Sequence, residues 1–234
     1  MADATQRARV TSIRELTPNV RELRLLPLEH PISFQPGQWV SLKLPLGNGN
    51  PLTRAYTMAD PPSTSDELVL VFDRVPDGLG SEYLFHVNEG TELDVAGPYG
   101  RFVLPTPLQK EMLFLARYTG IVPVRCMLHQ ELAPDSRVVL IYTMPSDVES
   151  LYHAEFTELA SRRDGFRYIP ITSRLRSDVS VQEWPESKVL QPYVTADRPL
   201  SVFISGIRAF VRPLRGHLME LGFERREIRA ETYD

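Results

Sequence analysis

Residues 34–40 read Phe34-Gln35-Pro36-Gly37-Gln38-Trp39-Val40, and residues 54–57 read Arg54-Ala55-Tyr56-Thr57. Both stretches belong to a series of short runs, rich in Val, Ile and Leu, that fills the first hundred residues. Turn residues separate these runs, which is typical of antiparallel strands. The sequence therefore predicts a six-stranded antiparallel β-barrel with one short helix over 81–87 and strands over 7–16, 20–26, 38–44, 52–58, 67–75 and 92–96.

The second half of the chain has a different pattern, in which apolar runs alternate with helix-like stretches. Strands that alternate with helices favour a parallel sheet with helices on both faces. We expect strands over 112–116, 138–142, 166–171, 200–204 and 228–233, and helices through 132, over 148–162 and over 210–221, the last with Gly222 as its C-cap. Prolines cluster at Pro105-Thr106-Pro107, so we place a β-barrel domain over 1–107 and an α/β nucleotide-binding domain over 108–234.

The composition excludes several classes of protein. The net charge of -4 gives no reason to expect a nucleic-acid partner. No apolar run approaches the roughly 20 residues of a membrane span, and the polar first residues lack a secretion signal, so we expect a cytoplasmic protein without membrane insertion. Cys126 is the one cysteine, which excludes an internal disulfide, a tetrahedral zinc site and an iron–sulfur cluster, so we predict no metal site.

The strand at 54–57 suits an aromatic cofactor that carries phosphates. It would point Arg54 and Tyr56 to one face and the Thr57 hydroxyl to the other. The guanidinium could pair with a pyrophosphate, the phenol could stack on a flavin ring, and the hydroxyl could hydrogen-bond the ring near its reactive nitrogen. Taken alone, these residues are explained better by a barrel strand with a surface Arg and a core Tyr.

Together, residues 34–40 and 54–57 resemble the opening of the ferredoxin–NADP reductase superfamily, whose pattern is Pro-Gly-Gln-aromatic and then Arg-x-Tyr-Ser/Thr. The resemblance implies a compact two-domain flavoprotein without an iron–sulfur domain. It implies that Arg54 meets the flavin phosphates, that Tyr56 packs on the flavin, and that Thr57 contacts the isoalloxazine as a catalytic residue. Ala55 lies in the same cofactor-binding strand. The family uses FAD and FMN, and we expect FAD.

Two glycine motifs in the same half extend the resemblance. Gly78-Leu79-Gly80-Ser81 precedes the short helix, with Ser81 as its expected N-cap. The family places the flavin pyrophosphate at such a turn, which implicates Gly80 and Ser81 in cofactor binding; a plain capped helix explains the turn equally well. Gly97-Pro98-Tyr99-Gly100-Arg101-Phe102 resembles the Gly-Pro-x-Gly-x-Phe signature that ends the barrel, and we expect it to be architectural.

A third glycine motif, Thr119-Gly120-Ile121-Val122-Pro123, follows the first strand of the second half. A strand, a glycine turn and a helix N-terminus form the usual geometry for a dinucleotide pyrophosphate, so Thr119, Gly120 and Pro123 are predicted to bind a nicotinamide cofactor. The family usually has Gly-Gly-Thr-Gly-Ile-Ala-Pro, and Arg117-Tyr118 replace its first two residues. The Tyr118 side chain would obstruct the ligand, swing away from it, or contact the flavin edge.

Ser205-Gly206-Ile207 falls where the family carries Cys-Gly-Pro-x-x-Met. The resemblance places Ser205 near the site of hydride transfer, as a catalytic residue, and Gly206 in the cofactor site. Because Ser205, Ile207 and Phe210 all depart from the motif, we expect slower hydride transfer than in a typical member.

The chain ends in Glu231-Thr232-Tyr233-Asp234. Many members of the family end with a Glu followed by an aromatic residue that covers the nicotinamide side of the flavin. By this resemblance Tyr233 is the lid and Glu231 its acidic catalytic neighbour. A final strand with an exposed Tyr is the competing interpretation.

Thr172-Ser173-Arg174 follows the third strand of the second half. In NADP-dependent members a Ser-Arg pair binds the 2′-phosphate, which suits a guanidinium fork. Ser173 and Arg174 therefore favour NADPH slightly over NADH as co-substrate. A solvated loop cation explains the same residues at least as well.

The resemblance as a whole implies an FAD-dependent oxidoreductase. It would pass reducing equivalents between NAD(P)H and a separate one-electron carrier such as a ferredoxin or flavodoxin, or to a small-molecule acceptor. An alternative is a flavin-binding electron-transfer or regulatory subunit with a degenerate nicotinamide site. A third possibility is a scaffold without a cofactor.

Overall fold

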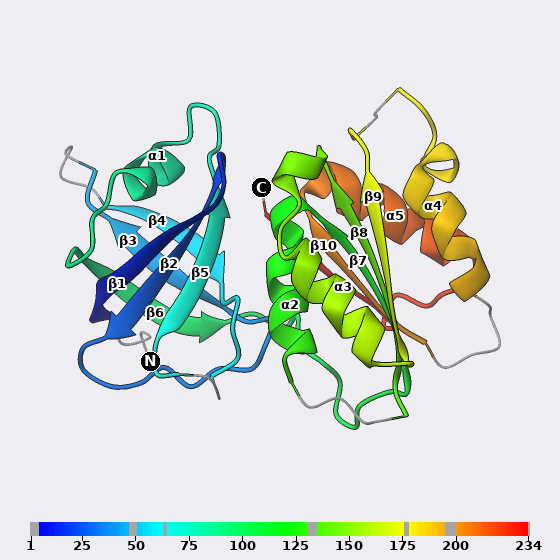
Figure 1. Ribbon diagram of the computed structural model, residues 1–234, viewed down its shortest axis with the longest axis horizontal. Helices are drawn as coiled ribbons and strands as arrows, with labels where there is room; N and C mark the ends of the chain where they lie inside the picture. The colour runs from blue at the N-terminus through cyan, green and yellow to red at the C-terminus, as the bar shows by residue number, and fades with distance from the viewer. Residues whose placement is uncertain are drawn as a thin grey trace. The chain divides into compact units, whose positions relative to one another are not determined.

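The computed structural model describes residues 5–46, 51–62, 65–130, 135–175, 178–194 and 200–233. It divides into two compact units, Met1–Leu104 with Arg125–Gln130, and Pro105–Val124 with Glu131–Asp234. The first unit contains an antiparallel sheet and the second a parallel one (Figure 1). None of the described helices is long and apolar enough to cross a membrane.

The antiparallel sheet has six strands in the order β4-β3-β6-β1-β2-β5. A bridge between Met58, just after β4, and Leu70 of β5 joins the two edges of this sheet. The predicted six-stranded barrel is therefore confirmed. Its strands are β1 (Gln6–Thr17), β2 (Val20–Pro27), β3 (Trp39–Leu44), β4 (Leu52–Thr57), β5 (Leu68–Asp73) and β6 (Glu92–Tyr99), with the helix α1 (Leu79–Phe85) between β5 and β6.

Strand β3 shows the strict alternation of buried and half-buried residues that builds one side of the barrel core. On β3, the side chains of Val40, Leu42 and Leu44 are fully buried, and the intervening residues are half-buried. This period of two is what a strand with one face toward a core requires.

Two of the sequence motifs meet in this unit because Gly37 has no side chain. Gly37 has φ +98, and a Cβ at this position would lie 1.9 Å from the carbonyl oxygen of Phe102. Phe102 itself is 3% exposed. The Pro-Gly turn before β3 is thus packed directly against the end of the Gly97–Phe102 motif.

The parallel sheet has five strands in the order β11-β10-β7-β8-β9. Its elements are β7 (Glu111–Arg117), the 3-10 turn η1 (Tyr118–Gly120), α2 (Ile121–Leu128), β8 (Arg137–Met144), the 3-10 turn η2 (Asp147–Glu149), α3 (His153–Arg162), β9 (Phe166–Thr172), η3 (Val181–Glu183), α4 (Pro185–Leu190), η4 (Gln191–Tyr193), β10 (Leu200–Gly206), α5 (Arg208–Glu220) and β11 (Ile228–Thr232). The predicted α/β fold with a parallel sheet is confirmed.

The direction of the crossovers explains where the helices lie. The path from β7 to β8 to β9 steps one way across the sheet, and the path from β10 to β11 steps the other way. Right-handed crossovers then place the helices that follow β7 and β8 on one face and α5 on the other, and Figure 1 shows α3 in front of the sheet and α5 behind it. The carboxyl ends of β7 and β10 therefore meet where the strand order reverses, which is where ligands of such folds bind.

Several predicted helix boundaries are wrong or lie outside the described residues: α1 spans Leu79–Phe85 instead of the predicted 81–87, and α5 begins at Arg208 instead of the predicted 210. The helix predicted from 148 begins at His153, because Tyr152 has φ 57, a left-handed conformation that cannot continue a helix. The C-cap of α5 is Leu221, and Gly222, with φ +98, follows it. The predicted end of the second-half helix at 132 lies outside the described residues; α2 ends at Leu128.

Replacing Gly37 with alanine is expected to destabilise the barrel severely. The G37A variant places a Cβ against the Phe102 carbonyl and also forces a side chain into the left-handed region, so we expect a loss of roughly 3 kcal/mol or more in the free energy of unfolding. Urea denaturation measures this loss.

The matched control is Gly90, which has φ +87 and nothing within 4 Å of an added Cβ. G90A should cost only the conformational penalty of about 1–2 kcal/mol. Equal losses for the two variants would show that the close approach of Phe102 does not matter.

Candidate cofactor and nucleotide site

Arg54 on β4 lies against the first turn of α1. A Cβ added at Gly80 would be 3.1 Å from Arg54 Cγ and 3.4 Å from Leu52 Cδ2, so the absence of a side chain at position 80 makes room for the arginine stem. The residue is exposed, and its Nη1 donates to the carbonyl oxygen of Thr53 at 2.9 Å. Two of the residues predicted to hold flavin phosphates, Arg54 and Gly80, are therefore neighbours.

Tyr56 shares a strand face with Arg54 and is half-buried. Its ring meets Phe72 edge-on, with centroids 5.7 Å apart. Burial raises the pKa of the phenol to about 12, an effect that the nearby Arg54 charge reduces and Asp73 reinforces. The phenol thus stays protonated at neutral pH, and the half-buried ring is suited to stacking.

The side chains of Thr57 and Ala55 point to the opposite face of β4. Thr57 is 5% exposed and pairs with Trp39 of β3, whereas Ala55 is exposed. Arg54 and Tyr56 therefore share one side of the strand, and Thr57 lies on the other. A ring that contacted all three would have to lie at the end of this strand.

The predicted N-cap role of Ser81 is wrong. Gly78 is the N-cap and the helix begins at Leu79, so Ser81 lies inside the first turn. Its hydroxyl donates to the carbonyl oxygen of Gly78 at 2.9 Å and accepts from the amide of Val75 at 3.1 Å. Ser81 thus holds the loop before the helix instead of capping the helix.

In the second unit, the turn of residues 117–120, which is predicted to bind a dinucleotide, packs against the end of β10. A Cβ added at Gly120 would lie 2.4 Å from the carbonyl oxygen of Ser205 and 2.8 Å from the Cα of Gly206. A Cβ added at Gly206, which has φ +143, would meet Arg117 Cβ at 3.1 Å. Only glycine at positions 120 and 206 permits this close approach of the two strand ends.

The side chain of Ser205 also connects β10 to the turn that contains Gly120. It is fully buried, and its hydroxyl donates to the carbonyl oxygen of Gly120 at 2.6 Å. This hydrogen bond explains a hydroxyl at this position as a support for the turn.

The last strand brings the predicted C-terminal residues to the same place. Glu231 is the register partner of Ser205, and the amide of Tyr233 donates to the carbonyl oxygen of Gly206 at 3.2 Å. Burial raises the pKa of the Glu231 carboxyl to about 6. Ser205, Gly206, Glu231 and Tyr233 are thus brought together at the carboxyl ends of β10 and β11.

The remaining predicted residues of this unit lie around these strand ends. Thr119 and Gly120 form η1, and Pro123 is buried in the first turn of α2, where a missing amide costs nothing. Ser173 and Arg174 follow β9 and line a cavity of about 270 Å³ with Lys188. Ser173 is linked to the dinucleotide turn because Arg117 Nη2 donates to its carbonyl oxygen at 3.1 Å.

Arg117 is buried, although it replaces a small residue of the family motif. Its side chain is 8% exposed, and Nη1 lies 4.0 Å from Oε1 of Glu186, which also accepts from the Thr143 hydroxyl at 2.7 Å. Desolvation lowers the pKa of the Arg117 guanidinium, and the Glu186 carboxylate opposes this effect. At this distance the two groups form an ion pair without a hydrogen bond, since Arg117 Nη1 has no hydrogen-bond partner among the described residues, and the pair brings the end of β7 near α4.

Tyr118 reaches Glu149 of η2 with its side chain. Its backbone has φ 50, and its hydroxyl donates to Glu149 Oε2 at 2.8 Å. The left-handed conformation costs a non-glycine residue about 1–2 kcal/mol, and a hydrogen bond to a charged group contributes about 1.5–3 kcal/mol. The bond to Glu149 is therefore large enough to offset the strain.

Sequence reasoning missed Glu149 and Glu186. The usual acidic signal of dinucleotide folds does not mark Glu149, because that signal lies about 20 residues beyond the glycine turn and Glu149 lies 29 residues beyond Gly120. No local pattern marks Glu186, since its partners Arg117 and Thr143 lie far from it in the sequence.

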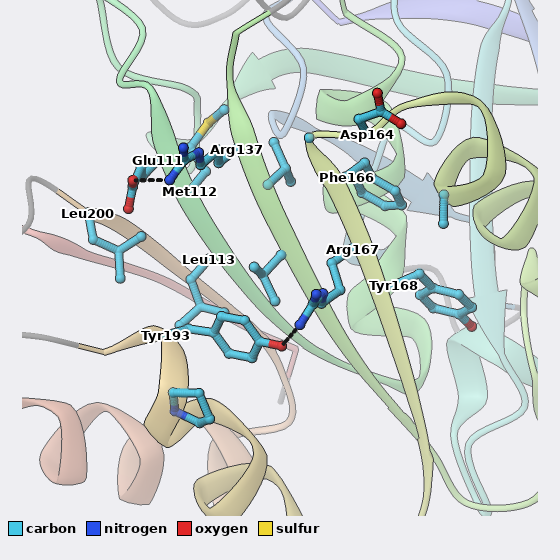
Figure 2. A pocket seen from close by; sticks show the side chains of 15 residues that line it. Glu111, Met112, Leu113, Arg137, Asp164, Phe166, Arg167, Tyr168, Tyr193 and Leu200 are labelled. Atoms are coloured by element: carbon cyan, nitrogen blue, oxygen red, sulfur yellow. Dashed lines mark hydrogen bonds and ion pairs between the residues drawn. The ribbon is translucent and has the colours of Figure 1, made fainter.

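A larger cavity of about 720 Å³ lies elsewhere in the second unit (Figure 2). Its lining includes the first residues of β7, β8, β9 and β10, and Figure 2 shows Arg137 directed at Glu111 and Arg167 at the Tyr193 hydroxyl. Because ligands of open parallel sheets bind at the carboxyl ends of the strands, we assign no cofactor to this cavity.

Comparison with known proteins identifies the family. A family model described as an oxidoreductase FAD-binding domain matches residues 7–104. Ferredoxin–NADP reductase B of Sorangium cellulosum is 32% identical over 237 residues, which cover 97% of each chain. This chain belongs to the ferredoxin–NADP reductase family. It is an FAD-binding oxidoreductase, and the resemblance inferred from residues 34–40 and 54–57 is confirmed.

Other relatives are longer proteins or share the fold alone. The reductase component DmpP of phenol 2-monooxygenase from Pseudomonas sp. is 30% identical over 178 residues, which are 75% of this chain and 48% of that protein. The chain thus spans about half the length of this second relative. A ferredoxin–NADP+ reductase from Neisseria gonorrhoeae, solved with bound FAD and NADP, has a TM-score of 0.82 at 21% identity and covers 98% of this chain and 99% of its own.

Removing the Ser205 hydroxyl is expected to weaken the second unit. S205A leaves the Gly120 carbonyl without its buried donor, so we expect a loss of about 1–3 kcal/mol in the free energy of unfolding, measured by urea denaturation. S205T, which keeps the hydroxyl but adds a methyl group, tests whether the site is also tightly packed. Unchanged stability of S205A would show that the hydrogen bond is dispensable.

Glu231 should make stability depend on pH. Because burial raises its folded pKa to about 6, above the ordinary value of 4.5, the folded state is favoured while the carboxyl is protonated. The stabilisation is complete below pH 4.5 and is lost as the pH rises through 6. E231Q should therefore raise the melting temperature at pH 7.5 and leave it unchanged near pH 4.

The matched control for this charge change is E89Q, at an exposed carboxylate in the other unit. It should not show the same pH-dependent gain. An identical gain for E89Q and E231Q would assign the effect to net charge.

Proposed function

We propose that this reductase accepts a hydride from NAD(P)H at the carboxyl ends of β7 and β10 and passes electrons to a separate ferredoxin-type or flavodoxin-type carrier. The observation that carries the proposal is the convergence of Gly120, Ser205 and Gly206 at the point where the strand order reverses, the usual ligand position of such sheets. Relatives that are named as ferredoxin reductases and as reductase components of oxygenases support the proposal.

The barrel residues fit FAD. The exposed guanidinium of Arg54 beside the glycine turn at Gly80 is a donor set suited to a pyrophosphate. The half-buried ring of Tyr56 offers an aromatic surface, and its protonated hydroxyl remains a donor. Thr57 would approach the ring from the end of the strand. Bound FAD supplies the chemistry that converts a two-electron donor into one-electron steps.

The residues of the second unit fit a nicotinamide dinucleotide. Thr119, Gly120 and Pro123 would receive the pyrophosphate at the start of α2, and Arg174 with Lys188 would provide positive charge at the adenosine end. Ser205 and Gly206 would shape the nicotinamide end, with Tyr233 as an aromatic cover and Glu231 as its acidic neighbour. These residues bind and orient, and no side chain is required to act as a strong acid or base.

NADPH is the slightly favoured donor, because Ser173 and Arg174 follow β9. Slower hydride transfer than in a typical member remains a prediction from Ser205, Ile207 and Phe210. Four further points also remain predictions. They are the identity of the carrier, the use of a small-molecule acceptor in its place, a cytoplasmic location, and a domain boundary between residues 107 and 108.

The decisive experiment is an anaerobic titration of purified, FAD-loaded protein with NADPH and with NADH, followed by flavin absorbance. Bleaching by either donor supports the proposed reaction, and stopped-flow measurement of the same bleaching gives the rate of hydride transfer. If excess of both donors leaves the flavin oxidised, the protein is instead a flavin-binding subunit with a degenerate nicotinamide site. A protein that remains colourless after supplementation with FAD would contradict both.

The variant R54A is expected to weaken FAD binding by roughly 10- to 100-fold, because a charge-assisted contact to phosphate is lost. Fluorescence titration of the apoprotein with FAD measures the dissociation constant. The control R162A changes the net charge equally at an exposed residue of α3 that pairs with Glu158. Equal weakening by both variants would argue against a specific contact from Arg54.

A further inference from the structure

The turn formed by residues 117–120, here called the dinucleotide turn, is attached to three neighbouring strand ends by side-chain hydrogen bonds. Arg117 donates to the carbonyl oxygen of Ser173 after β9, and Tyr118 donates to Glu149 in the loop after β8. The Ser205 hydroxyl of β10 donates to the carbonyl oxygen of Gly120. The turn is therefore held from three directions.

Two of these three contacts lie in the interior. Arg117 is 8% exposed and Ser205 is fully buried, so both act on the turn from beneath. Tyr118 differs from them because it is half-exposed. It is the member of this set that can be close to a ligand on the surface of the turn.

Tyr118 also has the conformation that most needs support. Its φ of 50 suits glycine, and a bulky side chain keeps such a conformation only where its surroundings hold it. If φ relaxed to a negative value, the peptide groups on both sides of Tyr118 would rotate. The amide of Thr119, inside the turn, would then change direction.

Glu149 is suited to hold the tyrosine in place. Its side chain is 8% exposed and belongs to η2, so the acceptor is fixed in position. A carboxylate is electrostatically unfavourable beside a turn that receives a pyrophosphate. Its presence is therefore explained better by the hydrogen bond it accepts from Tyr118 than by its charge.

We propose that Tyr118 and Glu149 form a positioning pair that holds the dinucleotide turn in the conformation that receives the pyrophosphate of NAD(P)H. The inference rests on the proposed function, because that function places the pyrophosphate at this turn. A glycine at position 118 would adopt the positive φ without help; here the hydrogen bond between Tyr118 and Glu149 stabilises it. Both are positioning residues that act through the turn.

The test measures the dissociation constants of NADP+ and NAD+ for the FAD-loaded full chain by isothermal titration calorimetry. Y118F removes only the hydroxyl, and E149A removes the acceptor carboxylate together with its charge. Each is expected to weaken both dinucleotides roughly tenfold and by similar factors, because the pyrophosphate is common to both ligands. The expected kinetic signature is a raised KM for the donor with an unchanged kcat.

E149Q and Y118G separate geometry from charge and from general destabilisation. The glutamine oxygen of E149Q can still accept the phenol, so its affinity should equal or exceed that of the unaltered chain. Glycine adopts φ 50 without support, so E149A should no longer weaken binding when it is introduced into Y118G. A merely structural role of Glu149 would weaken binding equally in both backgrounds.

Several results would overturn the pair. They are unchanged affinity of Y118F, a loss in E149Q as large as in E149A, or an equal effect of E149A with and without Y118G. A different outcome, in which the unaltered chain binds neither dinucleotide, would overturn the proposed function and the pair with it. If the unaltered chain binds the dinucleotides and the variants bind them with the same affinity, the positioning pair alone is overturned.

Discussion

The second unit depends on the contact between the dinucleotide turn and the end of β10. Gly120 lies so close to the Ser205 carbonyl that no Cβ fits, and the Ser205 hydroxyl donates back to the Gly120 carbonyl. This contact joins the first and fourth strands of the unit at the point where the strand order reverses. The helix α2 follows this turn directly, and the amide of Tyr233 after the last strand donates to the carbonyl oxygen of Gly206.

The barrel is organised by the same kind of constraint. Gly37 admits the Phe102 carbonyl, and Gly80 admits the stem of Arg54. In each case a missing side chain lets a distant segment approach closely. The stem of Arg54 thus lies beside the first turn of α1, where position 80 has no Cβ.

The departures from the family pattern at Arg117 and Tyr118 are compensated within the structure. Arg117 is balanced by Glu186 and by the Ser173 carbonyl, and Tyr118 by Glu149. These partners follow β8 and β9 or belong to α4, so the changes at the turn are linked to three other segments. Both replacements are therefore accommodated by the packing of this unit.

The sequence by itself determined the two folds and most candidate residues. The periods of two and of 3.6, the turn glycines and the Arg-x-Tyr-Thr stretch are local, so they can be read without knowing what lies beside them. Helix ends were predicted less accurately. The hydroxyl of Ser81 bonds the loop before the helix, and the left-handed conformation of Tyr152 sets the start of α3. Only the tertiary structure revealed Glu149, Glu186 and the supporting role of Ser205. A hydrogen bond between segments 30 to 90 residues apart leaves no periodic trace in either of them.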